Sequence, residues 1–376
     1  MRDIGIYIHI PFCKKKCDYC DFVSFPNKEE MMGRYVDCLI KEIADRANDS
    51  IVKTIYIGGG TPSILNPHNI EEILFAIRSN FAVADEVETT IEINPGTATK
   101  KKLEDYKKFG INRLSIGLQS GNDKLLKKIG RIHTYKDFEN TVNLAKEAGF
   151  KNINADMIIG LPDQTIYDVE DTIDKLLKLN LTHISIYSLI VEEKTPIEER
   201  LLKGEIKLPD DEMERYMYWF AKRKLEDNGY VHYEISNFAK PGYYSKHNMD
   251  CWSQKEYLGF GISAASYENK VRYVNKDNLE SYIENIENGK AYKNIKIEER
   301  QSIKAQMSEY MILNLRKING VDIKDFKKKF NESPLLLYEK KLVKLLDEDL
   351  VDISPDYIRL TKKGLDLANI VWEEFL

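Results

Sequence analysis

Residues 5–20 of the chain read GIYIHIPFCKKKCDYC. The first six of these residues, rich in isoleucine and bounded by Pro11, are typical of a buried β-strand. A short loop follows and carries Cys13, Cys17 and Cys20, with three and then two residues between them. Closely spaced thiols after a strand, in a long chain with an odd number of cysteines, predict a metal site rather than disulfides.

Three thiolates on one loop can bind three irons of a cubane and leave the fourth iron open to a small molecule. Zinc is the structural alternative, but it usually takes four ligands, commonly from two CxxC pairs. No second pair exists here, because Cys38 and Cys251 stand apart from the loop and from each other. The lysines between Cys13 and Cys17 would offset the charge of an anionic cluster, or they form a solvated loop face.

Short β-branched runs alternate with amphipathic stretches over the first half of the chain, which predicts an α/β fold with a parallel sheet and right-handed crossovers. The predicted strands are Gly5–Ile10, Thr54–Gly58, Thr89–Asn94, Arg113–Gly117, Asn154–Gly160 and Thr182–Leu189. The predicted helices between them are Glu30–Ala47, Asn69–Asn80, Lys101–Gly110, Tyr135–Gly149 and Tyr167–Leu179.

Unusual residues gather where these strands end. They are the three cysteines, the glycines at 58–60, Glu92, Gln119 and Asp156. Parallel β/α units carry their chemistry at the carboxyl ends of the strands. The sequence therefore predicts that one rim of the sheet forms a single site.

The CxxxCxxC spacing after the first strand resembles the radical S-adenosylmethionine (SAM) superfamily. The flanking segments, 7–12 and 18–22, are similar to the branch that contains oxygen-independent coproporphyrinogen III oxidase (HemN) and the haem chaperones (HemW). The resemblance covers nearly the whole chain and is strongest over residues 5–190. It implies a partial (β/α)6 TIM-like barrel, a [4Fe–4S] cluster on the three cysteines, and SAM on the open iron, where reduction cleaves SAM to a 5′-deoxyadenosyl radical.

The resemblance also implies which residues contact SAM. They are Tyr7, Tyr19, Gly59, Gly60, Thr61, Glu92, Gln119, Arg131 and Asp156. Each of them alone has an ordinary structural explanation, such as a tight turn for the glycines. Glu92 interrupts an apolar strand, and a carboxylate in that position needs a partner. No catalytic residue is assigned.

Two features distinguish the oxidases from the haem chaperones. The oxidases carry a fourth cysteine two positions after the third, and Phe22 stands there in this chain. The oxidases also have an extension before the first strand, where this chain has only about four residues. We therefore expect a haem chaperone that binds SAM and lacks oxidase activity, whether or not it cleaves SAM. Radical decarboxylation of coproporphyrinogen III is the alternative.

The segment from His247 to Trp252, HNMDCW, is similar to the His-Asn-x-x-Tyr-Trp motif of the chaperone branch, with Cys251 where tyrosine is usual. It implies that His247, Cys251 and Trp252 lie at a haem, with His247 or Cys251 as an axial ligand. The alternative is an ordinary aromatic loop. The remaining histidines have no ligand spacing and are interpreted as structural or surface residues: His9, His68, His133, His183 and His232.

The second half of the chain loses the strand–helix alternation. We predict a barrel core over 1–190, a barrel extension and linker with the HNMDCW segment over 191–295, and a mainly helical, winged-helix-like domain over 296–376. The extension is predicted to contain a helix at Leu208–Asn228, an antiparallel segment at Tyr230–Phe238 and a loop at Pro241–Tyr257. A winged helix can bind DNA, and a DNA-binding regulator that senses cluster status is a third hypothesis. The mixed charge of the tail favours a structural cap or a surface for a haem acceptor.

Composition limits the class of protein. Hydrophobic residues make up 43% of 376 residues, which excludes wholesale disorder, and the net charge of −5 is not typical of a nucleic-acid binder. The sequence shows no signal peptide and no apolar run of the roughly 20 residues that span a membrane. We expect a cytoplasmic protein without a transmembrane segment. The resemblance implies haem, haem-accepting proteins such as respiratory enzymes, and an electron donor for the cluster as its partners.

Overall fold

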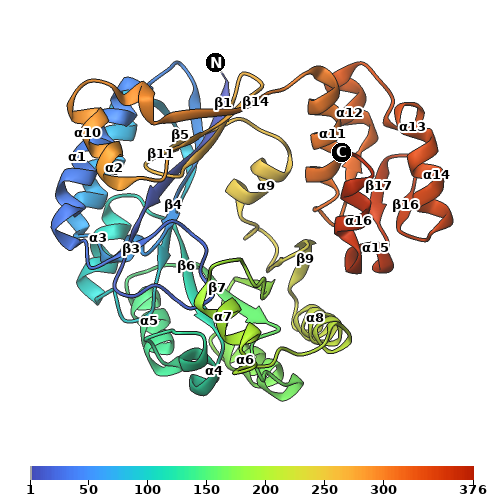
Figure 1. The fold of residues 1–376 in the computed structure, drawn as a ribbon, viewed down its shortest axis with the longest axis horizontal. Coiled ribbons are helices and arrows are strands. Elements are labelled where there is room, and N and C mark those ends of the chain that lie inside the picture. Colours follow the sequence, from blue (N-terminus) through green and yellow to red (C-terminus); the bar gives the residue numbers. More distant parts are fainter. Residues whose placement is uncertain (1) are drawn as a thin grey trace.

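A twelve-stranded sheet runs through most of the computed structural model, which describes residues 2–376 (Figure 1). In sheet order its strands are β14 (Ile295–Arg300), β13 (Val271–Asn275), β12 (Ala265–Glu268), β11 (Tyr257–Phe260), β1 (Asp3–Ile10), β4 (Ile51–Gly59), β5 (Ala82–Ile93), β6 (Arg113–Gln119), β7 (Asn152–Ile159), β8 (His183–Ser188), β10 (Asn237–Ala239) and β9 (Val231–Glu234). The six strands from β1 to β8 in this order are parallel, which confirms the predicted partial (β/α)6 barrel.

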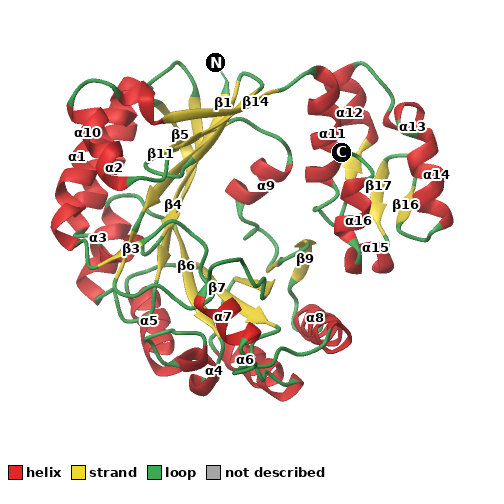
Figure 2. Ribbon diagram, in the orientation of Figure 1, coloured by secondary structure: helices red, strands yellow, loops and turns green. Residues whose placement is uncertain are grey.

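Helices cover the outer side of the curved sheet, and Figure 2 shows them in red outside the yellow strands. They are α1 (Met32–Asp45), α2 (Pro67–Asn80), α3 (Lys100–Lys108), α4 (Asp123–Lys128), α5 (Tyr135–Glu147), α6 (Ile166–Lys178), α8 (Asp211–Glu226) and α10 (Leu279–Glu287). Helix α7 (Pro196–Leu202) instead packs beside the cysteine loop, where the amide of Ile197 donates to the carbonyl of Asp18 at 2.9 Å. Side chains alternate along each strand, so Ile6, Ile8 and Ile10 are fully buried in the core. The residues between them, such as Tyr7 and His9, face the inside of the barrel.

Local capping explains where several helices begin. Thr134 and Asp137 form a capping box at the start of α5, and Thr165 and Asp168 form the same motif at α6. The predicted start of the helix at Leu208 was too early, because Asp210 accepts a hydrogen bond from the amide of Met213 and α8 begins at Asp211.

The prediction of a loop from Pro241 to Tyr257 was wrong over residues 246–252, which form helix α9 (Lys246–Trp252). The reason is tertiary. The Glu88 carboxylate, on β5, accepts hydrogen bonds from the first amides of α9, and the Ser245 hydroxyl caps the same end. After α9 the chain adds β11 parallel to β1, followed by an antiparallel meander through β14 that the sequence did not predict.

The C-terminal residues form a second unit with its own core, drawn in orange and red in Figure 1. Its elements are α11 (Ile303–Asn314), β15 (Val321–Asp322), α12 (Ile323–Phe330), α13 (Pro334–Leu337), α14 (Glu339–Asp347), β16 (Val351–Ile353), β17 (Tyr357–Leu360), α15 (Lys362–Asp366) and α16 (Ala368–Glu373). Helices followed by a small antiparallel sheet confirm the predicted winged-helix-like unit. The domain limits at 190 and 295 stay predictions.

The second unit joins the barrel through backbone hydrogen bonds. The amide of Ile235 donates to the carbonyl of Arg316 at 3.0 Å, and the amide of Ile318 donates to the carbonyl of Tyr233 at 3.1 Å. Within the described part of the chain, no helix is long and apolar enough to cross a membrane.

Candidate functional site

The cysteine loop leaves the carboxyl end of β1 and is tied to the turn after β4. Two short parallel strands, β2 (Phe12–Cys13) and β3 (Phe25–Pro26), pair at the base of the loop. The amide of Gly60 donates to the carbonyl of Ile10 at 2.9 Å. A Cβ atom on Gly60 would lie 3.1 Å from the Cys13 sulfur and 2.8 Å from the carbonyl oxygen of Phe12, so glycine permits this close approach.

The three thiols of the loop are a donor set suited to an iron–sulfur cluster. Cys13 Sγ lies 3.3 Å from the Thr61 hydroxyl, and Cys17 Sγ accepts a hydrogen bond from Arg131 Nη1 at 3.5 Å. Burial raises the pKa of Cys13, and burial together with the neighbouring Cys17 raises the pKa of Cys20 to about 11. Cluster binding must therefore displace these thiol protons.

A single metal ion would need a tighter arrangement. From residue 2 to residue 376, no group of three histidine, cysteine or acidic side chains is close enough to hold one ion. A cubane spreads its cysteine ligands over separate irons, so this finding concerns only a single-ion site such as zinc.

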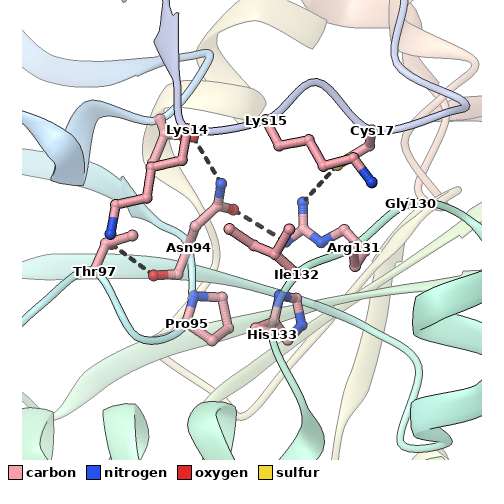
Figure 3. A pocket seen from close by; sticks show the side chains of 11 residues that line it. Lys14, Lys15, Cys17, Asn94, Pro95, Thr97, Gly130, Arg131, Ile132 and His133 are labelled. Atoms are coloured by element: carbon pink, nitrogen blue, oxygen red, sulfur yellow. Dashed lines mark hydrogen bonds between the residues drawn. The ribbon is translucent and has the colours of Figure 1, made fainter. Parts of the chain in front are cut away.

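Arg131 extends toward the cysteine loop from the segment after α4, as Figure 3 shows. Its Nη2 donates to Asn94 Oδ1 at 3.0 Å and to the carbonyl of Gly117 at 2.8 Å. Its Nε is buried and has no hydrogen-bond partner among the described residues. A buried guanidinium with an unused donor has capacity for a carboxylate, which is the group that SAM would offer.

The Glu92 carboxylate, which interrupts an apolar strand, has hydrogen-bond donors. Its two carboxylate oxygens accept hydrogen bonds from the Tyr56 hydroxyl at 2.9 Å and from the amide of Gly59 at 3.1 Å. Burial, with the nearby charge of Asp156, raises the pKa of Glu92 to about 7. A carboxylate whose charge is this sensitive to its surroundings is typical of a ligand site.

The other predicted SAM residues lie along the same rim or on the inner face of the barrel. Asp156 accepts hydrogen bonds from Ser115 at 3.0 Å and Asn154 at 2.8 Å. Gln119 adopts φ of +68°, a left-handed conformation that a non-glycine residue rarely takes and that is common at functional sites. Tyr19 packs against a small apolar cluster beside the loop, and Thr61 accepts a hydrogen bond from Asn94.

A cavity of about 440 Å³ lies between β1, the end of the cysteine loop, α9 and β11. It is lined by Tyr7, His9, Asp21, Phe22, Val23, His247, Cys251, Tyr257, Ser263 and Ala265. His247 and Cys251 are four residues apart on α9 and so share one helix face. The volume of the cavity is in the range of small-molecule and cofactor pockets.

His247 is fixed in this cavity by three other elements. Its Nδ1 lies 2.8 Å from the Thr54 hydroxyl, and its amide donates to Glu88 at 3.1 Å. A Cβ atom on Gly5 would lie 3.3 Å from the imidazole ring. Burial, with the charge of Arg113, lowers the pKa of His247 to about 4, so the imidazole is neutral near pH 7. A neutral imidazole with Nδ1 already engaged offers Nε2 to a metal.

Trp252 is not brought to the cavity. The Arg316 guanidinium lies 4.3 Å from the centre of its ring, and the same guanidinium also stacks on Trp372. The predicted haem residues are therefore divided: His247 and Cys251 line the cavity, and Trp252 packs toward the C-terminal unit.

Several residues of these sites were not identified from the sequence. His9 was interpreted as a structural or surface residue, yet it lines the cavity with Nδ1 3.1 Å from the Tyr7 hydroxyl. A Cβ atom on Gly59, at φ of +111°, would lie 2.6 Å from the His9 ring. Strand alternation places Thr54 on the inner face with Tyr56, but no sequence signal pairs it with His247.

The other histidines lie outside these sites. His68 is exposed, whereas His133, His183 and His232 are buried and hydrogen-bonded.

Comparison with known proteins identifies two families in the chain. A model described as the radical SAM superfamily matches residues 7–176, and a model described as the HemN C-terminal domain matches residues 302–367. A protein of Lactococcus lactis subsp. lactis named "Heme chaperone HemW" is 38% identical over 370 residues, covering 98% of this chain and 96% of its own. The protein of the same name from Bacillus subtilis is 38% identical over 375 residues, covering 98% of both chains.

A solved structure shares the fold. Coproporphyrinogen III oxidase (HemN) from Escherichia coli matches with a TM-score of 0.87 and 24% identity, over 100% of this chain and 90% of the oxidase. At this identity the likeness supports the architecture and carries no argument about the reaction.

Proposed function

We propose a function for this chain from its family: it belongs to the radical SAM superfamily and, within it, to the haem chaperones HemW. In this proposal the protein binds haem in the cavity beside α9 and passes it to haem-accepting proteins. A [4Fe–4S] cluster on Cys13, Cys17 and Cys20 and a molecule of SAM are its cofactors. We place the protein in the cytoplasm, where respiratory enzymes are candidate acceptors.

One observation carries the proposal for haem. The neutral imidazole of His247 projects into a cavity large enough for a cofactor, and Tyr7, Phe22 and Tyr257 supply aromatic surface around it. Haem iron is commonly held by histidine, and aromatic rings pack against the macrocycle. Cys251, on the same face of α9, is a second donor in reach of the cavity. Burial raises the pKa of its thiol to about 12, which leaves His247 as the donor available without loss of a proton.

The residues of the rim act as binding groups for the cluster and SAM. The cluster, when bound, offers an open iron and accepts an electron from a partner. The thiols of the loop release their protons to hold it, Thr61 hydrogen bonds with Cys13, and Arg131 donates to Cys17. We propose that Glu92 and Arg131 orient the charged groups of SAM, which the unpartnered Nε of Arg131 supports. The haem cavity includes Tyr7, so the two sites share a wall.

A titration tests the proposal. Anaerobically reconstituted protein, with iron and acid-labile sulfide counted, is titrated with haem in the presence and absence of SAM. We expect saturable haem binding at one site, with an absorption spectrum of histidine-ligated iron, followed by transfer to an apo haem protein. Protein that takes up the cluster and shows no saturable haem binding would contradict the assignment as a chaperone.

The alternative function is radical decarboxylation of coproporphyrinogen III. Phe22, which is 63% exposed on the wall of the cavity, stands where the oxidases carry a fourth cysteine. We therefore expect no decarboxylated product when the reconstituted protein is incubated anaerobically with coproporphyrinogen III, SAM and a reductant. Multiple turnovers to a decarboxylated product would establish the oxidase instead.

A further inference from the structure

Helix α9, which carries His247 and Cys251, lies between the two units of the molecule. It packs against β4 of the barrel and against α11 of the C-terminal unit, and Figure 1 shows it between the sheet and the orange and red helices. The barrel holds its first turn through Glu88 on β5 and Thr54 on β4. A helix of seven residues has few internal hydrogen bonds, so its position depends on what holds each end.

The C-terminal unit holds the other end of α9 with an aromatic clamp. Trp252 is the last residue of the helix and directly follows Cys251. The Arg316 guanidinium lies 4.3 Å from the centre of the Trp252 ring and 5.0 Å from the centre of the Trp372 ring, so one cation joins α9 to α16. The buried Nε of Arg316 has no hydrogen-bond partner among the described residues, so the guanidinium is held by stacking on the two indole rings.

The residues directly after α9 are bound to the same unit. Lys317 Nζ donates to the Ser253 hydroxyl at 3.3 Å. The buried amide of Gln254 donates to the Glu309 carboxylate at 2.8 Å and accepts from Lys329 Nζ at 2.9 Å. These hydrogen bonds and the clamp fix the end of α9 to the C-terminal unit, whereas the start of the helix is fixed to the barrel.

We propose that the C-terminal unit positions the haem ligand, with Arg316 holding α9 in the place from which His247 reaches the iron. The inference rests on the proposed haem site and goes beyond it, because it gives the C-terminal unit a function. Arg316 is a positioning residue, since it contacts α9 at Trp252, near the opposite end of the helix from His247. Loss of the groups that orient a metal-binding histidine typically costs roughly 10–100-fold in affinity. A helix held by the barrel alone would therefore release haem faster.

A pair of matched variants tests the proposal by the rate of haem release. Arg316→Met keeps the length of the side chain and removes the planar cation. Arg359→Met is the control, because Arg359 is half-buried in the same unit, stacks on Tyr357 and also has a buried Nε without a partner among the described residues. Haem released from the loaded protein is captured by excess apomyoglobin, and the Soret absorbance is followed. We expect release to be roughly tenfold faster in Arg316→Met and unchanged in the control.

Two further variants separate positioning from a general effect on folding. If Arg316 acts through His247, Arg316→Met should not speed haem release in a His247→Ala background. Gln254→Asn tests the same end of α9 independently. Asparagine tolerates the left-handed φ of +54° at this position, but its side chain is one methylene too short for the bonds to Glu309 and Lys329. Release from Gln254→Asn should therefore also be faster than from wild type.

Equal release rates in wild type and Arg316→Met would overturn the proposal. An equal acceleration in Arg359→Met would also overturn it, by showing a general loosening of the C-terminal unit. So would faster release in the His247→Ala background, because the effect would then bypass the ligand. If Arg316→Met does not fold, Gln254→Asn decides, and an unchanged rate there rejects the proposal. Wild-type protein that binds no haem would instead reject the proposed function on which the inference rests.

Discussion

The cysteine loop and helix α9 carry the two proposed sets of metal ligands at opposite ends of β1, and the fold holds them to different degrees. The loop leaves β1 at Ile10, and residues 14–22 are exposed or half-buried. His247 lies beside Gly5, near the other end of the strand, and is held by Thr54 and Glu88. The fold thus fixes the His247 imidazole through neighbouring strands, whereas Cys17 and Cys20 lie on a partly exposed loop.

The protonation of the ligands follows the same division. Burial raises the pKa values of Cys13 and Cys20, so cluster assembly must release protons. Burial lowers the pKa of His247 to about 4, so its ring is already in the form that binds a metal. We expect cluster assembly to respond more strongly to single substitutions than haem binding does.

The largest effect is expected from the cysteine loop. Cys17→Ser leaves two thiolates, too few to hold a cubane with one open iron, and we expect iron and acid-labile sulfide to fall to background. Cys251→Ser changes a cysteine outside the loop and should retain the full cluster. The measurement is the iron and sulfide content of anaerobically reconstituted protein. A Cys17→Ser protein with wild-type iron content would disprove the assignment of the loop.

The imidazole site should respond next. His247→Ala removes the proposed iron ligand, and we expect haem affinity to fall by roughly two orders of magnitude, about 3 kcal/mol. The cluster content should stay unchanged, because His247 is held by Thr54 and Glu88 and not by the cysteines. His68→Ala, at an exposed histidine on α2, is the control. Haem affinity is read from the Soret absorbance, and an unchanged spectrum in His247→Ala would assign the ligand to another side chain, with Cys251 the first to test.

A smaller effect is expected from the residue that orients this ligand. Thr54→Val removes the hydroxyl that engages Nδ1 of His247 while keeping the shape of the side chain. We expect haem affinity to fall roughly tenfold, the usual effect of losing a hydrogen bond that orients a metal-binding histidine. Thr54→Ser keeps the hydroxyl and should restore both affinity and the wild-type Soret position. Equal losses in the valine and serine variants would show that Thr54 acts only through packing.

A last effect, on stability rather than on binding, concerns the charge of Glu92. Because its folded pKa is raised to about 7, the folded protein keeps a proton that the unfolded chain loses above about pH 4.5. The contribution of Glu92 to the free energy of unfolding therefore falls as pH rises from about 4.5 to about 7. Glu92→Gln lacks this loss, so the stability of the variant relative to wild type should rise by roughly 2.5 kcal/mol on going from pH 5 to pH 8.

Urea denaturation of the protein without cofactors, at both pH values, measures this difference. Glu30→Gln, at an exposed carboxylate before α1, is the control, and its stability relative to wild type should be the same at both pH values. If the stability of Glu92→Gln relative to wild type is the same at pH 5 and pH 8, the fold does not raise the pKa of Glu92. Added SAM should reduce the difference if its charged groups pair with Glu92.

The sequence by itself determined the elements whose signals are local. Isoleucine-rich strands, glycines after helices, and capping pairs such as Thr165 and Asp168 depend on neighbours in the chain, so the parallel sheet could be predicted. The three cysteines are also neighbours in sequence, and their spacing indicated the cluster without any knowledge of the fold.

Only the tertiary structure decided what surrounds His247. Helix α9 forms because Glu88, on a distant strand, accepts the hydrogen bonds of its first amides, and the ring is oriented by Thr54 and accommodated by Gly5. The same is true of Trp252, which the motif grouped with haem and the fold turned toward Arg316. A short helix gains its stability from tertiary contacts rather than from its own sequence. The register that brings distant strands together is set by the whole sheet, and no local pattern encodes it.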